Sequence, residues 1–158
     1  MRNELSAGGV AARREGDTWL VALLKTEHKR GLVWVLPKGH VELAAGENLA
    51  EAAKREVGEE AGIRDLSVKD ELGVTRFKFQ AETALVYKTV HYFLMVTNQK
   101  ILSPQTEEGL LEAKWFPIDE AVSALAYDTD QDIVLRAREV LLGRNEPRAR
   151  PAKPRIRI

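Results

Sequence analysis

The chain contains no cysteine, and this absence excludes disulfide bonds, zinc–thiolate sites and cysteine-based catalysis. It also lacks any apolar run that approaches the length needed to span a membrane. Its first residues, Met-Arg-Asn-Glu-Leu, form no apolar signal core. A chain without cysteine fits a reducing compartment. We therefore expect a cytoplasmic protein with no membrane partner.

The chain also lacks net charge, because 24 Lys and Arg balance 24 Asp and Glu, but its ends differ. Residues 144–158 carry six basic side chains against Glu146 alone, a net charge of +5 that leaves −5 on residues 1–143. Three prolines in this basic tail argue against a packed element and favour a linker or a partner-contacting arm. Binding to nucleic acid is not favoured, although the tail leaves it open.

The remaining residues, 1–143, have the length and composition of one globular domain, since the whole chain is 44% hydrophobic and 30% charged. Apolar periodicity and turn residues predict alternating strands and helices, typical of the α/β class. Strands are expected at residues 6–13, 19–25, 33–36, 84–97 and 113–116, with one or two more at 66–80. Helices are expected at residues 47–61, 118–125 and 130–142.

Three glutamates, Glu56, Glu59 and Glu60, have the spacing that places side chains on one face of a helix. Helical phase puts Glu56 and Glu60 on the apolar side that faces the protein body, with Glu59 at its edge. A solvated charge face is the alternative, and this phase disfavours it. Unpaired charge is costly there, and like charges at this spacing repel. Hard cations prefer carboxylate oxygens, so the pattern predicts a site for Mg²⁺ or Mn²⁺.

The same segment resembles the Nudix box, the signature of the Nudix hydrolase family. That pattern runs from a glycine through five residues to a glutamate, then through seven more to Arg-Glu-hydrophobic-X-Glu-Glu-X-Gly-hydrophobic. The second half matches in full, from Glu47 through seven residues to Arg-Glu-Val-Gly-Glu-Glu-Ala-Gly-Ile at positions 55–63. The first half departs from it, because seven residues separate Gly39 from Glu47. We place the two additional residues within positions 43–45.

The resemblance implies the Nudix fold, a mixed β-sheet sandwiched between α-helices, over roughly residues 4–143. It implies hydrolysis of a phosphoric anhydride in a nucleoside diphosphate linked to another moiety. Glu56, Glu59 and Glu60 would hold the metal, and one of them would also act as general base. The backbone carbonyl of Gly39 would join the metal shell. Bound metal ions neutralise phosphate oxygens and acidify water, which is the chemistry that this reaction needs.

The box also implies structural and substrate-binding residues. Arg55 would brace Glu47 rather than contact phosphate, although the helical phase places it away from the metal face, near Glu51. Lys38 and His40, on either side of Gly39, are candidates for substrate contact, each weighed evenly against a purely local role.

A further carboxylate is expected from the loop before a late strand, where members of the family often supply one. Glu107, Glu108 and Glu112 lie there, ahead of Trp115. We expect one of the three to be a metal ligand or base, with Glu108 and Glu112 as the metal-ligand candidates.

Segments 6–10, 36–42 and 88–94 resemble the branch of the family that contains diadenosine polyphosphate and diphosphoinositol polyphosphate hydrolases. Tyr92 lies where that branch often places a base-stacking tyrosine, with Tyr87 and Tyr127 as alternatives and packing within the sheet as the other interpretation of Tyr92. The expected substrate is a small nucleotide, first a diadenosine polyphosphate.

Other functions stay open at this stage. They are a MutT-like hydrolase of 8-oxo-dGTP and similar triphosphates, a diphosphoinositol polyphosphate hydrolase, and a non-catalytic nucleotide sensor. Non-catalytic members typically lose box glutamates, and all three are present here. A homodimer is also left open.

Overall fold

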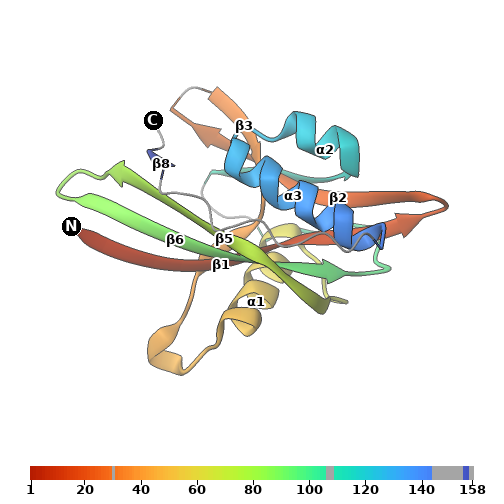
Figure 1. Cartoon of the computed structure of the whole chain (residues 1–158), viewed down its shortest axis with the longest axis horizontal. Coiled ribbons are helices and arrows are strands. Elements are labelled where there is room, and N and C mark those ends of the chain that lie inside the picture. Colours follow the sequence, from red (N-terminus) through yellow and green to blue (C-terminus); the bar gives the residue numbers. More distant parts are fainter. Residues whose placement is uncertain (30, 106–108, 144–154, 157–158) are drawn as a thin grey trace.

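The computed structural model describes residues 1–29, 31–105, 109–143 and the backbone of residues 155–156. In these ranges eight strands form one sheet, accompanied by helices α1, α2 and α3 (Figure 1). The strands are β1 (Arg2–Glu15), β2 (Thr18–His28), β3 (Gly31–Val35), β4 (Lys38–His40), β5 (Ser67–Gln80), β6 (Leu85–Val96), β7 (Leu110–Pro117) and β8 (Arg155–Ile156). The helices are α1 (Leu49–Ala61), α2 (Ile118–Ala124) and α3 (Asp128–Leu141), with a 3₁₀ turn, η1, at Leu43–Ala45.

The sheet is mixed and runs in the order β3-β2-β1-β6-β5-β8, with β4 paired to β1 and β7 paired to β2. Strands β1 and β6 are parallel, as are β5 and β8, and the other pairs are antiparallel. One edge of β1 pairs with β6 from Arg2 to Ala12. Its other edge pairs first with β4 and then with β2. Strands β4 and β2 therefore adjoin successive parts of the same edge of β1, beside α1.

Helix α1 covers one face of the sheet, and α2 and α3 cover the other (Figure 1). Because side chains alternate along a strand, each strand contributes to both layers of the core. On β1, Ala7 and Ala11 pack toward α1, whereas Val10 and Ala12 pack toward α2 and α3. The expected α/β architecture, a mixed sheet between helices, is confirmed.

Most predicted elements are present with shifted ends, and three short elements were not predicted. Residues 67–80 form one strand, β5, rather than two. The box helix begins at Leu49, because Asn48 caps it, and not at Glu47. The three elements that were not predicted are β4, η1 and β8. Within the described residues, no helix is long and apolar enough to cross a membrane.

The basic tail falls mostly outside the described residues. Its backbone at residues 155–156 forms β8, which runs parallel to Phe77 and Lys78 of β5. These two residues form a strand within a tail that was expected to be mostly a linker or a partner-contacting arm, since two backbone positions are enough to pair with the open edge of β5. The predicted division at residue 143 stays a prediction.

Candidate active site

Helix α1 begins with a capping box that its own sequence supplies. The Asn48 side chain accepts the N–H of Glu51 at 2.8 Å, and the Glu51 carboxylate accepts the N–H of Asn48 at 3.3 Å. Each side chain thereby satisfies a backbone donor that the first helical turn leaves without an intrahelical partner. Glu51 hydrogen-bonds to Asn48 at the start of the helix. Arg55, one turn further on, forms its hydrogen bonds with other residues.

Arg55 connects the box helix to the loop before it. Its Nε and Nη2 donate to the two carboxylate oxygens of Glu47 at 2.7 and 3.0 Å, so the predicted contact between these residues is present. Its Nη2 also donates to the carbonyl of His40 at 3.0 Å. Its Nη1 donates to Glu56 at 2.7 Å and lies 3.5 Å from a carboxylate oxygen of Glu59. The expectation that Arg55 stays away from the glutamate face is therefore wrong, because its long side chain reaches around the helix.

The Arg55–Glu47 pair shifts both ionisation equilibria. Hydrogen bonds from Arg55, and from the backbone N–H of Glu42, lower the pKa of Glu47 from 4.5 to about 2. The same pairing, together with a hydrogen bond to Glu56, raises the pKa of Arg55 above its usual value. Both side chains are therefore charged near neutral pH, and the bidentate pair closes the loop of residues 42–47 against α1.

Gly39 lies in β4 directly beneath the Glu56 carboxylate. A Cβ at this position would overlap that carboxyl group, so a glycine is required for Glu56 to approach the strand. The Glu56 side chain is 15% exposed and the Glu59 side chain 36% exposed. This difference agrees with the predicted phase, in which Glu56 faces the protein body and Glu59 lies at the edge.

Glu60 contacts β4 at Lys38, the residue next to Gly39, against which the Glu56 carboxylate lies. One of its carboxylate oxygens accepts the backbone N–H of Lys38 at 2.8 Å. Glu56 and Glu59 instead face Arg55, so the three carboxylates turn two ways. Accordingly, no group of three Asp, Glu or His side chains in the described part of the chain is drawn together around one point.

The chemistry of this donor set fits a hard divalent cation. Glu56, Glu59 and Glu60 supply only oxygen donors, which Mg²⁺ and Mn²⁺ prefer. Arg55 already offsets the charge of Glu56 and Glu59 from one side. The backbone of Gly39 lies against Glu56, where the family pattern expects its carbonyl to contribute.

A cleft of about 650 Å³ opens beside Glu60. It lies between strands β2, β3 and β4 on one side and the pair β5–β6 on the other. Its lining includes Lys38, Glu60, Phe77, Phe79, Lys88 and Tyr127. The Lys38 ammonium lies 5.9 Å from the centre of the Phe77 ring, and the rings of His28 and Tyr127 meet edge to face at 6.0 Å. The cleft therefore combines a carboxylate at one end, cationic side chains along it and aromatic rings.

Tyr92 packs within the core, which was the other interpretation given for it, and its assignment to substrate binding is wrong. Its side chain is fully buried in the core on the α3 side, and its hydroxyl lies 3.4 Å from a carboxylate oxygen of Asp130. A ring enclosed in this way presents no face to a nucleotide base. Of the three tyrosines, all within the described ranges, Tyr127 lines the cleft, whereas Tyr87 contacts Lys78 on a neighbouring strand.

Glu112 is a second correction. It is exposed in β7 and pairs in register with Lys25, next to the pair formed by Leu24 and Ala113. Leu24 and Ala113 face α1, so alternation turns Glu112 to the opposite face of the sheet, away from the glutamates. Glu107 and Glu108 lie outside the described residues.

Lys38 and His40 differ in exposure. Lys38 is half-buried and lines the cleft, whereas His40 is exposed and contributes its carbonyl to Arg55. Phe77, Phe79 and Lys88 were missed by the sequence analysis, although they too line the cleft. Alternation along residues 74–79 was visible, but no motif indicates which face of that strand meets the box.

Comparison with known proteins identifies the family. The family model described as NUDIX domain matches residues 2–144. A Mycobacterium tuberculosis relative named MutT4 is 39% identical over 158 aligned positions, and Nudix hydrolase 6 of Arabidopsis thaliana is 37% identical over 123. The alignments cover 96% and 77% of this chain, but only 62% of the first relative and 41% of the second.

A crystal structure of a C. elegans Ap4A hydrolase in a binary complex has the same fold. It superposes with a TM-score of 0.70 at 25% sequence identity, and the match covers 89% of this chain and 98% of that one.

Proposed function

This chain belongs to the Nudix family, and on that premise we propose that it is a divalent-cation-dependent pyrophosphohydrolase. Its proposed substrate is a nucleoside diphosphate linked to a second moiety, and a diadenosine polyphosphate is the first choice. The likeness to the C. elegans Ap4A hydrolase supports this choice.

One observation carries the proposal: the glutamate face of α1 meets the cleft at Glu60. Glu60 belongs to both, since it hydrogen-bonds to the backbone of Lys38 and lines the cleft beside the Lys38 side chain. A diphosphate is strongly anionic, and Lys38 and Lys88 line the same cleft. The cleft thus offers cationic side chains to phosphate oxygens next to carboxylates that suit a metal.

In this proposal the side chains have distinct roles. Glu56, Glu59 and Glu60 hold a divalent cation, and one of them takes the proton from the attacking water. The bound cation neutralises phosphate charge and lowers the pKa of water. Arg55 keeps Glu56 in place while it anchors Glu47. Lys38 orients the diphosphate against the three glutamates.

The aromatic part of the cleft suits a nucleotide base. We assign base stacking to Tyr127, which lies in the cleft, instead of Tyr92, which lies in the core. Stacking of a base on an aromatic ring contributes about 1–3 kcal/mol. Tyr127→Ala should therefore raise KM about tenfold with little change in kcat, whereas Tyr127→Phe should behave like wild type. Tyr92→Phe is the control, because it changes only a buried hydroxyl, and it should leave KM unchanged. An unchanged KM in Tyr127→Ala would overturn the assignment.

A second candidate is a MutT-like hydrolase of oxidised nucleoside triphosphates. The relative named MutT4, at 39% identity, favours it. Both candidates use the same glutamate face, and they differ in what occupies the cleft beyond the scissile diphosphate.

A substrate panel with Mg²⁺ tests these proposals. Diadenosine tetraphosphate, 8-oxo-dGTP, ADP-ribose and a diphosphoinositol polyphosphate would each be incubated with the enzyme, and the products separated by chromatography. We expect the highest kcat/KM for diadenosine tetraphosphate and loss of turnover in EDTA. A preference for 8-oxo-dGTP would select the second candidate. No cleavage of any substrate with Mg²⁺ or Mn²⁺ would favour the non-catalytic sensor.

A further inference from the structure

The last turn of α1 carries charge against its own helix dipole. Glu59 and Glu60 lie in this turn, and it contains no basic residue. The carboxyl end of a helix bears a partial negative charge and carbonyls without intrahelical partners, so two carboxylates there favour fraying. Contacts from outside the helix must therefore hold the residues that face the proposed metal.

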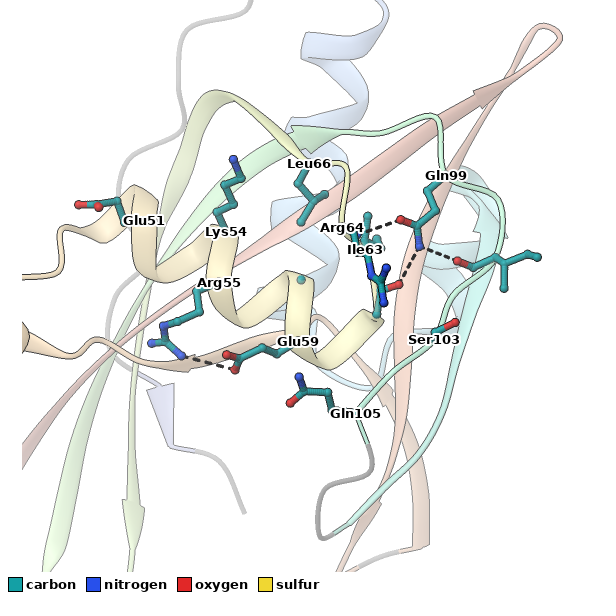
Figure 2. A pocket seen from close by; sticks show the side chains of 13 residues that line it. Glu51, Lys54, Arg55, Glu59, Ile63, Arg64, Leu66, Gln99, Ser103 and Gln105 are labelled. Carbon is teal, nitrogen blue, oxygen red and sulfur yellow. Dashed lines mark hydrogen bonds and ion pairs between the residues drawn. The ribbon is translucent and has the colours of Figure 1, made fainter.

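The Gln99 side chain supplies such contacts. Its Nε2 donates to the carbonyl of Gly62, the C-cap of α1, at 2.8 Å, and to the carbonyl of Ile101 at 2.7 Å. Its Oε1 accepts the N–H of Arg64 at 2.9 Å. Figure 2 shows the Gln99 side chain beside the end of α1, with these three hydrogen bonds drawn. One amide thus joins the helix end to the loop that follows β6.

The backbone of the same loop continues along the helix. The N–H of Ser103 donates to the carbonyl of Gly62 at 3.2 Å, and the N–H of Gln105 donates to the carbonyl of Glu59 at 3.1 Å. A Cβ at position 62 would overlap the backbone of Ser103, so this approach requires a glycine there in addition to the positive φ of 71°. The carbonyl of a proposed metal-holding residue, Glu59, is therefore fixed by a segment far from it in sequence.

The loop is in turn anchored to the sheet. The N–H of Gln99 donates to the hydroxyl of Thr97 at 3.0 Å, and the N–H of Thr97 donates to the carbonyl of Ala12 in β1 at 3.0 Å. The indole of Trp115 in β7 donates to the carbonyl of Lys100 at 2.8 Å. Gln99 therefore links the end of α1 to a loop with fixed attachments to β1 and β7.

We propose that Gln99 is a positioning residue for Glu59 and Glu60. Together with the N–H of Ser103 it satisfies the Gly62 carbonyl, and it thereby holds the last turn of α1 in helical geometry. This geometry keeps Glu60 beside the cleft and Glu59 beside Arg55. The inference rests on the proposed function, because fixing these carboxylates matters for the cation that they are proposed to hold. Gln99 itself touches neither the cation nor the substrate.

The test compares Gln99→Met with Gln131→Met in the full-length protein. Met has nearly the shape of Gln but neither donates nor accepts these hydrogen bonds. Gln131 is a matched control, because its Nε2 donates at 3.0 Å to the carbonyl of Leu125, the C-cap of α2 in the layer on the opposite face of the sheet. Mn²⁺ affinity would be measured by electron paramagnetic resonance, and amide hydrogen exchange would report on Gly62 and Ile63.

We expect Gln99→Met, which removes all three side-chain hydrogen bonds, to weaken Mn²⁺ binding about three- to tenfold and to speed exchange of both amides by a similar factor. Gln131→Met should change neither quantity. Gln99→Asn, which is too short to reach both carbonyls, should reproduce the Gln99→Met result and carries the test if Gln99→Met does not fold. Equal Mn²⁺ affinity in wild type and both Gln99 variants would overturn this proposal alone. A wild type that binds no Mn²⁺ would overturn the proposed function and this inference with it.

Discussion

Helices α1 and α3 have similar lengths, 13 and 14 residues, lie on opposite faces of one sheet and both carry acidic side chains in the first turn, but the charges at their carboxyl ends differ. Helix α3 has Asp128 and Asp130 in its first turn and Arg138 in its last, and both placements complement the helix dipole. Helix α1 ends with Glu59 and Glu60 and has no basic residue in its last turn.

The difference separates a helix arranged for stability from one arranged for a site. Each unfavourable charge at a helix end costs about 0.3–1 kcal/mol. In α1, contacts outside the last turn offset this cost: the capping box of Asn48 and Glu51, the Arg55 network and the loop held by Gln99. Carboxylates at the carboxyl end of a helix oppose its dipole. Where neighbouring segments hold such a helix in place, the carboxylates indicate a functional site even without a sequence motif.

The strongest test of the comparison is neutralisation of the α1 carboxylates. Glu59→Gln and Glu60→Gln should each reduce kcat by at least about 100-fold at saturating Mg²⁺, as expected when a group that stabilises developing charge is lost. Each should also stabilise the metal-free protein by about 0.3–1 kcal/mol, because it relieves the repulsion at the helix end. Thermal unfolding and steady-state kinetics measure both effects.

Asp132→Asn, an exposed change in α3, is the control for this test and should leave kcat unchanged. If both glutamine variants kept most of their activity, the glutamate face would not be the metal site.

Removal of the Arg55 network should have the next largest effect. Arg55→Ala should reduce kcat/KM about 10- to 100-fold, which is typical when the partner of a metal-binding side chain is removed. Glu47→Ala should act in the same direction, and the double variant should lose less stability than the two single losses combined. Strictly additive losses of unfolding free energy would show that the pair does not act as one unit.

Shortening the loop before α1 should have a smaller effect. The turn η1 contains no buried residue, so deletion of Ala44 and Ala45 should leave a folded, metal-dependent hydrolase. Loop closure changes by well under about 1 kcal/mol for such a deletion. We expect KM for the best substrate to change more than kcat. A deletion variant with normal KM and lost kcat would instead place the loop within the catalytic scaffold.

The smallest expected effect is on how the free energy of unfolding changes with pH under acidic conditions. The pKa of Glu47 is about 2 in the folded protein against an ordinary value of 4.5, so its ionised form stabilises the fold above pH 4.5. That contribution is lost progressively as the pH falls from 4.5 toward 2. The thermal midpoint of Glu47→Gln should therefore fall less steeply over this interval than that of wild type. In an Arg55→Ala background the two slopes should coincide, because Arg55 is the main cause of the shift.

The sequence by itself determined the helix of the box and the face that its glutamates share, whereas the pairing of Arg55 with Glu47 came only through the resemblance. The helix and the shared face depend on helical periodicity and on residues within a short span of chain. The lower exposure of Glu56 relative to Glu59 follows directly from the helical phase. The mixed sheet between helices also followed from the sequence, through the resemblance that the box carries.

Only the tertiary structure decided which residues from other strands meet the box. Tyr92 and Tyr127 were both candidates for the base. The register of β6 buries Tyr92, whereas Tyr127, the N-cap residue of α3, lies in the cleft. Glu112 faces away because its pairing with Lys25 fixes the side of the sheet that it occupies. The bond from Gln99 to Gly62 joins residues 37 positions apart. A shift of one residue in register exchanges the faces of a strand, so local patterns alone do not determine such contacts.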